Sequence, residues 1–275
     1  MEHTTDQFLA RGGVTIFTQT WTPQDPTALV VLAHGFAEHS GRYDHVAEAL
    51  NGAGYAVAAL DHRGHGRSGG PRARFATLGE LSADFGMFRA ELARTSDLPQ
   101  VLLGHSLGGA IVLDHLLGEH DPVEAVVLSG PYVRNGAAVH PLLKRLAPVI
   151  GRILPGAPTQ TVDSSQVSRD PAVVARYDAD PLNYRGGVPA STGAAVLAIE
   201  QHILSEASRI TEPVLIVHGT ADGLAAVSGS HDLAGALGSQ VVDLKTYDGL
   251  YHEVFNEPEQ DTVLADVIAW LAERV

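Results

Sequence analysis

The chain has 275 residues, of which 45% are hydrophobic and 18% are charged, a composition typical of a folded globular protein with a sizeable core. Its formal net charge of −14 argues against nucleic acid and strongly anionic membranes as partners, because both are bound through clustered Lys and Arg. Cysteine is absent, which excludes a disulfide framework, a thiolate metal site and a cysteine nucleophile.

The N-terminal residues contain neither a basic segment nor an apolar segment of the kind found in secretory signals. No stretch of the chain approaches the roughly 18 consecutive apolar residues of a transmembrane helix. We therefore expect a cytoplasmic protein, whose contact with a membrane would be peripheral.

Strands and helices alternate along the first half of the chain. Residues 14–22 alternate between polar and apolar like an edge strand, whereas the continuous apolar run 28–33 suits a strand buried on both faces. In chain order we expect further strands at 55–60, 101–103 and 123–128, and helices at 43–50, 78–92 and 107–117. This alternation predicts an α/β fold with a mostly parallel central sheet flanked by helices.

The pattern changes after residue 130. Residues 131–205 are rich in proline and contain short helical segments, but no clear buried strand. The alternation then resumes, with strands expected at 214–217 and 241–244 and helices at 228–237 and 258–271. We predict a core formed by residues 1–130 and 206–275, interrupted by an inserted helical cap at residues 131–205. Such insertions act as lids on open α/β sheets.

A short motif around Ser106 predicts the chemistry. Residues 104–108 read Gly-His-Ser-Leu-Gly and lie between an apolar strand and a predicted helix. At such a turn the α/β-hydrolase fold presents a nucleophilic serine, and the small glycines let the strand and the helix approach each other. We therefore expect an α/β-hydrolase fold in which Ser106 is the nucleophile.

A serine nucleophile needs a base and an orienting acid, which in this fold follow in the order Ser, Asp or Glu, His. Asp222 follows the strand at 214–217, and His252 lies between the strand at 241–244 and the last helix. Both loops leave the carboxyl ends of strands, so we predict Asp222 as the acid and His252 as the base. Weaker alternatives are His231 within a helix, Asp243 within a strand, Asp248 beside His252, and the runner-up acids Asp121 and Glu124.

Two backbone amides should form the oxyanion hole. One belongs to Leu107, which follows the nucleophile, and we assign the other to Phe36, in the loop after the strand at 28–33. In the same loop His34 is expected to brace the backbone. His105 is expected to be a buried, hydrogen-bonded neighbour of the nucleophile rather than a base.

The glycine-rich residues 61–68 contain an aspartate and two histidines. Their spacing does not match a helical zinc pair, and no further ligand group is evident. We expect Asp61 and Arg63 to tie loops together, and we predict neither a metal nor an organic cofactor.

Three segments carry a specific resemblance to a known family. Residues 34–43 read HGFAEHSGRY, residues 61–68 read DHRGHGRS, and residues 249–258 read GLYHEVFNEP. From about the first strand to the C-terminus the chain resembles the monoacylglycerol lipases of the α/β-hydrolase superfamily, especially the bacterial, mycobacterial-like branch. The resemblance implies a serine hydrolase that cleaves monoacylglycerol, a lipid ester, to glycerol and fatty acid.

By position, Ser106, Asp222 and His252 match the catalytic triad of that family, and Phe36 and Leu107 match its oxyanion residues. The resemblance also implies that Glu38 and Arg42 lie near the glycerol end of the substrate. An internal Glu38–Arg42 pair that shapes the loop is the alternative.

The chain departs from the family pattern at three places. Asp222 is followed by Gly-Leu-Ala-Ala instead of an apolar pair and a proline, and Leu107 stands where many members have Met. Residues 132–166 match least, so the preferred acyl length is open.

Apolar residues recur at helical spacing in that segment: Leu142, Leu143, Leu146, Val149, Ile150, Ile153 and Leu154. Two interpretations are open, a tunnel for an acyl chain with a face that touches lipid, or packing of the cap on the core. A carboxylesterase or lysophospholipase of the same fold is the alternative function. A non-catalytic binding protein is disfavoured because all three triad positions are filled. The oligomeric state is not predicted.

Overall fold

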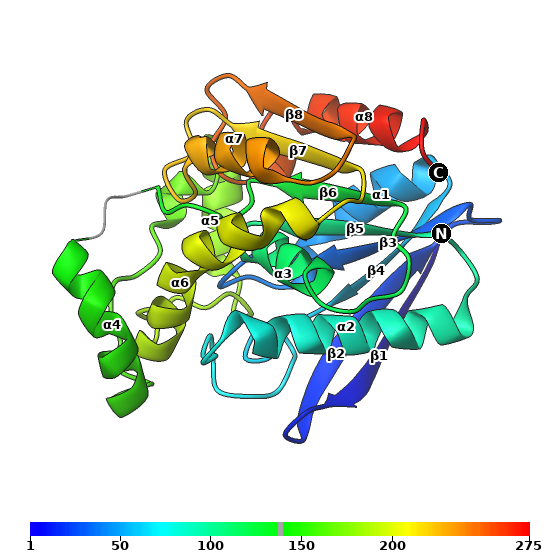
Figure 1. Ribbon diagram of the computed structural model, residues 1–275. Helices are drawn as coiled ribbons and strands as arrows, with labels where there is room; N and C mark the ends of the chain where they lie inside the picture. Colours follow the sequence, from blue (N-terminus) through cyan, green and yellow to red (C-terminus); the bar gives the residue numbers. More distant parts are fainter. Residues whose placement is uncertain (137–139) are drawn as a thin grey trace.

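The computed structural model describes residues 1–136 and 140–275, so residues 137–139 of the predicted cap, and the side chain of Leu143, lie outside the described residues. Eight strands form one sheet in the order β1-β2-β4-β3-β5-β6-β7-β8 (Figure 1). The strands are β1 (Glu2–Ala10), β2 (Val14–Thr22), β3 (Ala28–Ala33), β4 (Tyr55–Leu60), β5 (Gln100–His105), β6 (Ala125–Ser129), β7 (Val214–Gly219) and β8 (Val242–Tyr247). Strands β3 to β8 pair in parallel, which confirms the mostly parallel sheet.

Helices cover both faces of this sheet (Figure 1). They are α1 (Asp44–Gly52), α2 (Leu78–Thr95), α3 (Leu107–Leu116), α4 (Pro141–Ile153), α5 (Pro171–Ala179), α6 (Ala190–Glu206), α7 (Val227–Ala236) and α8 (Gln260–Leu271). Helices α1 and α8 lie on one face, and α2, α3 and α7 lie on the other. Among the described residues, no helix is long and apolar enough to cross a membrane.

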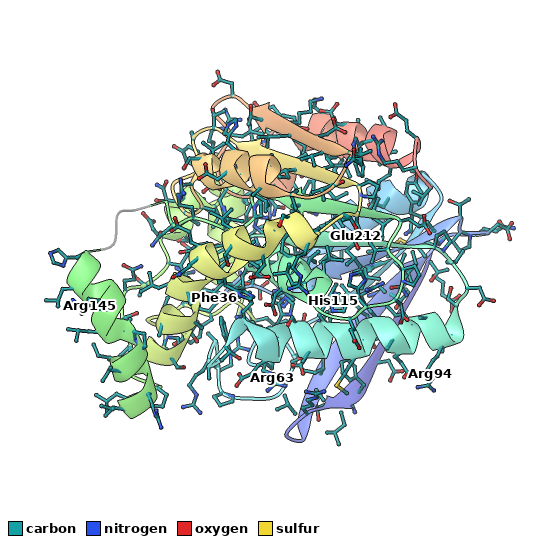
Figure 2. The ribbon with its side chains drawn as sticks, in the orientation of Figure 1. Phe36, Arg63, Arg94, His115, Arg145 and Glu212 are labelled. Atoms are coloured by element: carbon teal, nitrogen blue, oxygen red, sulfur yellow. The ribbon has the colours of Figure 1, made fainter. Side chains whose placement is uncertain are left out.

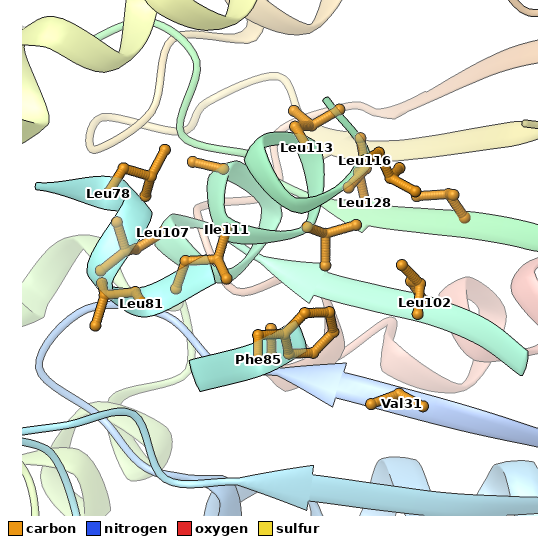
Figure 3. Close-up of a cluster of buried hydrophobic side chains, with 14 of the residues drawn as sticks. Val31, Leu78, Leu81, Phe85, Leu102, Leu107, Ile111, Leu113, Leu116 and Leu128 are labelled. Atoms are coloured by element: carbon orange, nitrogen blue, oxygen red, sulfur yellow. The ribbon is translucent and has the colours of Figure 1, made fainter. Parts of the chain in front are cut away.

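The central strands are buried along their whole length and are mainly apolar, with polar residues at their ends, because both of their faces are covered. In β3, Val31 belongs to the cluster formed with α2 and α3, whereas its neighbour Val30 belongs to the cluster formed with α1 and α8. Figure 3 shows the first cluster, in which Phe85 of α2 and Ile111 of α3 pack toward the sheet. Two complete hydrophobic layers thus hold the carboxyl ends of the parallel strands at one edge.

The N-terminal hairpin differs from the expectation. Residues 14–22 form β2 as predicted, but their assignment as an edge strand is wrong, because β1 pairs antiparallel with β2 along its length. The β1 strand is polar and almost entirely exposed, so it has no apolar pattern to reveal it. Its signal is the pair Gly12 and Gly13, both with positive φ, which joins the two strands.

Between β6 and β7 the described residues form the α-helices α4, α5 and α6. Helix α6 packs on α2 and α3, and its Ile199 and Ile203 are buried in the main hydrophobic cluster. Helix α4 packs on α6 and stands away from the sheet (Figure 1), and it carries Arg145, which is labelled in Figure 2. The large apolar side chains described on α4 and the residue after it are 39–70% exposed: Leu142, Leu146, Val149, Ile150, Ile153 and Leu154.

Candidate functional site

Ser106 occupies a sharp turn between β5 and α3. Its φ of 54° and ψ of −117° lie in a region that non-glycine residues rarely adopt. The flanking glycines are required by close approach, because a Cβ on Gly108 would lie 1.9 Å from the Ala33 carbonyl oxygen, and one on Gly104 would lie 2.6 Å from that of Gly108. The turn therefore has the geometry of a nucleophile elbow, with Ser106 at the N-terminus of α3.

The loops after β7 and β8 bring Asp222 and His252 into contact. His252 Nδ1 lies 2.6 Å from Asp222 Oδ2, and the side chains are only 6% and 0% exposed. The ring of His252 also lies 4.8 Å from that of His105, the residue before Ser106. The structure thus places the predicted acid, base and nucleophile at the same edge of the sheet.

Each carboxylate oxygen of Asp222 accepts two hydrogen bonds. Its Oδ1 accepts the backbone N–H groups of Leu224 and Ala225 at 2.8 and 2.9 Å, and its Oδ2 accepts from His252 and from His218 at 2.6 and 3.0 Å. Burial opposes ionisation, but the charge of His252 and the hydrogen bonds from both histidines outweigh it and hold the pKa of Asp222 well below its ordinary value. Asp222 is therefore an anion at every physiological pH.

The pKa of His252, the predicted base, is shifted upward. Burial lowers the pKa of His252, but the charge of Asp222 and its hydrogen bond, with smaller contributions from Glu253 and Glu38, raise the pKa above 6.5. No hydrogen bond joins Ser106 Oγ to His252 Nε2 in the part of the chain that the structure describes. Catalytic hydrogen bonds of this type often shorten only when substrate binds, so the arrangement fits a resting site.

The two amides expected in the oxyanion hole are available. Over residues 1–136 and 140–275, neither Leu107 N–H nor Phe36 N–H has a hydrogen-bond acceptor. A Cβ on Gly35 would lie 3.3 Å from Ser106 Cβ, so the loop that carries Phe36 runs directly beside the elbow. Two free amides beside a serine hydroxyl can hold the oxyanion of an acyl-transfer intermediate.

Glu38 and Arg42 form a buried network with Glu253. Arg42 Nη1 lies 2.6 Å from Glu38 Oε2, and its guanidinium makes two hydrogen bonds of 2.7 Å with Glu253. Glu38 also accepts the Gly35 N–H at 2.5 Å. The internal Glu38–Arg42 pair is thus confirmed, whereas contact of either residue with a substrate stays a prediction.

The sequence reasoning missed two residues of this site, His218 and Glu253. Each stands next to a residue or loop that the motifs identified, His218 at the end of β7 and Glu253 directly after the base. The signal for His218 was a polar residue that ends an otherwise apolar strand. Glu253 lies within the motif at residues 249–258, but nothing local indicates its pairing with Arg42, which lies 211 positions away.

The other predicted polar residues have structural contacts. His34 Nε2 accepts the backbone N–H of His62, and the ring of His105 hydrogen bonds Ser129, as expected of bracing and buried neighbours. Asp61 accepts the backbone N–H of Ser40 at 2.8 Å, and it also accepts that of Arg67.

The Arg63 guanidinium pairs with Asp84 of α2 and donates to the carbonyl oxygen of Arg11 in the turn between β1 and β2. Together with the bond from Ser40 to Asp61, this confirms that Asp61 and Arg63 tie loops together. Within the described residues there is no group of three or more His, Asp or Glu side chains placed to hold a metal ion.

The weaker alternatives lie elsewhere. His231 is exposed on α7, Asp243 accepts a hydrogen bond from Trp270, and Asp248 hydrogen bonds Thr220. A groove of about 650 Å³ between α2, α4 and α6 is separate from the elbow, since Ser106 and His252 do not line it.

Comparisons with known proteins identify the family of the chain. Residues 24–259 match the Hydrolase_4 family, described as serine aminopeptidase, S33. A monoacylglycerol lipase of Mycolicibacterium smegmatis is 46% identical over 98% of this chain and 96% of its own length, and the human monoglyceride lipase is 33% identical over 95% and 88%. The crystal structure of a Paleococcus ferrophilus monoacylglycerol lipase superposes with a TM-score of 0.84 at 33% identity, covering 99% of each chain. The chain therefore belongs to the Hydrolase_4 family and, within it, to the monoacylglycerol lipases, as an ester hydrolase of the α/β-hydrolase fold.

Proposed function

We propose that the protein hydrolyses monoacylglycerol to glycerol and fatty acid through an acyl-enzyme on Ser106. The observation that carries the proposal is the 2.6 Å contact between His252 and Asp222 beside a serine held at positive φ. The relatives named monoacylglycerol and monoglyceride lipases support the substrate class.

In the first half of the reaction His252 Nε2 takes the proton of Ser106 as Oγ attacks the ester carbonyl carbon. Asp222 holds the Nδ1–H tautomer and stabilises the imidazolium that forms. The amides of Leu107 and Phe36 hold the oxyanion, and each contributes about 3 kcal/mol to transition-state stabilisation. The C–O bond then breaks, and His252 gives its proton to the departing glycerol oxygen.

In the second half water replaces glycerol. His252 takes a proton from water as the water oxygen attacks the acyl carbon, and the same amides hold the second oxyanion. Collapse breaks the bond to Oγ, His252 returns a proton to Ser106, and the fatty acid leaves. The imidazole of His252 thus carries out every proton transfer of the proposed reaction.

The segment at residues 131–205 acts as the cap of this site, and α4 contacts the lipid surface from which the substrate comes. Support comes from the apolar side chains of α4, such as Leu146 and Ile153, which are 45% and 70% exposed along one face of the helix. An exposed apolar face on an amphipathic helix is typical of segments that lie on a membrane interface.

The experiment that tests the function is a substrate panel run with the purified protein and with Ser106→Ala. Monoacylglycerols of several chain lengths are compared with simple alkyl esters and lysophospholipids. We expect the highest kcat/KM on a monoacylglycerol and a loss of several orders of magnitude in kcat for Ser106→Ala, because the nucleophile is removed. A preference for alkyl esters or lysophospholipids would instead favour a carboxylesterase or lysophospholipase, and full activity in Ser106→Ala would remove Ser106 from the mechanism.

A further inference from the structure

His218 takes no part in the steps above, yet it contacts the acid. Its side chain is completely buried at the end of β7. Its Nε2 lies 3.0 Å from Asp222 Oδ2 and 3.1 Å from the carbonyl oxygen of Ala225, and its Nδ1 lies 2.7 Å from Ser230 Oγ on α7. Both edges of the ring are therefore engaged.

The partners assign the tautomer. Because Nε2 faces two oxygen acceptors, it carries the hydrogen and donates to Asp222 and Ala225, and Nδ1 of the neutral ring accepts the hydroxyl hydrogen of Ser230. A ring bonded at both nitrogens cannot rotate without breaking buried hydrogen bonds, which is costly. His218 thus presents a fixed N–H group to the carboxylate.

This N–H group shares one oxygen with the base. Asp222 Oδ2 accepts from His218 and from His252, while Oδ1 is occupied by two backbone amides. The carboxylate therefore cannot turn about its Cβ–Cγ bond without losing a donor. Since Asp222 sets the orientation of His252, any rotation of the Asp222 carboxylate would also loosen the orientation of the His252 ring.

We propose that His218 is a positioning residue of the active site, which holds Asp222 in the orientation that accepts the His252 Nδ1–H and so aims His252 at Ser106. The inference rests on the proposed Ser-His-Asp mechanism and extends it by a fourth side chain. The N–H group of His218 also offsets part of the negative charge on Oδ2, which weakens the attraction of Asp222 for a proton on His252.

Two substitutions separate positioning from simple filling of the core. His218→Leu introduces an apolar side chain of similar bulk and removes the Nε2–H donor. His218→Gln places an amide N–H where Nε2–H stands and an oxygen that accepts from Ser230. Ile216→Ala, at a fully buried apolar position two residues earlier on the same face of β7, is the matched control for lost packing.

The readouts are kcat, KM and the acid limb of kcat/KM against pH on a short, dispersed ester. We expect His218→Leu to lower kcat by about ten- to hundredfold with KM within about twofold, as for the loss of a hydrogen bond to a charged group. The acid limb should move to higher pH, because Asp222 then attracts the proton on His252 more strongly. The other titratable groups facing His252, which are Glu253, Glu38 and His105, are unchanged in this variant.

His218→Gln should restore most of kcat and the original acid limb, and Ile216→Ala should lower Tm while leaving both unchanged. In an Asp222→Asn background His218→Leu should cause no further loss, because its effect passes through Asp222. A full additional loss in that background, an unmoved acid limb in His218→Leu, or a folded His218→Gln as impaired as His218→Leu would each overturn the proposal.

If His218→Leu does not fold, Ser230→Ala replaces it. That variant frees Nδ1 and should lower kcat by about two- to fivefold, as for a neutral hydrogen bond, with the loss again absent in the Asp222→Asn background. An equal loss in both backgrounds would overturn the inference. Activity retained in Ser106→Ala would instead overturn the proposed mechanism itself, so the two failures are distinguishable.

Discussion

The loops that carry Asp222 and His252 differ in construction from helix α4. Around Asp222, charged groups are buried and every one has hydrogen-bond partners, so their positions are determined by many contacts. On α4, large apolar side chains are exposed and the helix packs on α6. The proposed chemistry therefore depends on groups held rigidly by their neighbours, whereas α4 presents an apolar surface that is not buried in the fold. Substitutions in the two regions should therefore have opposite signatures.

The largest effect is expected at Asp222. Asp222→Asn should lower kcat by about 10⁴-fold, because an amide at this position favours the wrong tautomer of His252. Initial rates on a monoacylglycerol and a thermal unfolding curve are measured together. A loss of less than about tenfold in a folded variant would show that Asp222 does not orient the base.

The buried network of Glu38, Arg42 and Glu253 is the next region to test. Arg42→Gln leaves Glu38 and Glu253, only 2% and 5% exposed, without their cation. We expect the free energy of unfolding to fall by about 3–5 kcal/mol, as for other buried ion pairs that lose one partner. Denaturant unfolding measures the change.

The control for that variant is Arg94→Gln, which removes an exposed pair with Glu91. It should change the free energy of unfolding by no more than about 0.5 kcal/mol. Equal effects of the two variants would mean that Arg42 does not stabilise the loops.

The pH dependence of the reaction reports the base directly. Since the proposed mechanism requires the neutral form of His252 and the pKa of His252 is raised above 6.5, kcat/KM should fall as pH decreases through a value above 6.5. The same shift contributes stability that is complete below pH 6.5 and is lost as pH rises through the raised pKa. A pH series of kcat/KM tests this, and an acid limb below pH 6.5 would show that Asp222 does not raise the pKa of His252.

The smallest effect on the folded protein is expected on α4. Leu146→Gln combined with Ile153→Gln should weaken binding to phosphatidylcholine vesicles at least about tenfold, because apolar area that would enter lipid is removed. The free energy of unfolding should stay within about 0.5 kcal/mol. Vesicle co-sedimentation and denaturant unfolding give the two values.

The buried face of the same helix offers the matched control. Ala147, only 8% exposed, lies on that face, so Ala147→Gln should instead lower the thermal stability. If it weakens vesicle binding as much as the double variant does without affecting stability, the exposed face is not the lipid contact.

Local patterns were sufficient to predict most of the fold and the three residues of the proposed triad. Ser106, Asp222 and His252 each follow a strand of the parallel sheet, and the carboxyl ends of parallel strands meet at one edge. The β1 strand escaped prediction because an exposed polar strand has no apolar periodicity.

The partners of the site residues could not be predicted in the same way. The pair of Glu38 with Arg42 is visible at a spacing of four residues, but Glu253 completes it from a distant loop. Likewise, the second donor to Asp222 depends on how His218 is held by Ser230, a contact between β7 and α7. Such contacts depend on the packing of loops against each other, which no single segment encodes.

The most direct test of the proposed mechanism is covalent labelling with a fluorophosphonate, followed by peptide mass spectrometry. The geometry predicts one adduct, on Ser106, formed far more slowly in His252→Ala because the hydroxyl then lacks its base. An adduct on a different residue, or an undiminished labelling rate in His252→Ala, would contradict the assignment of nucleophile and base.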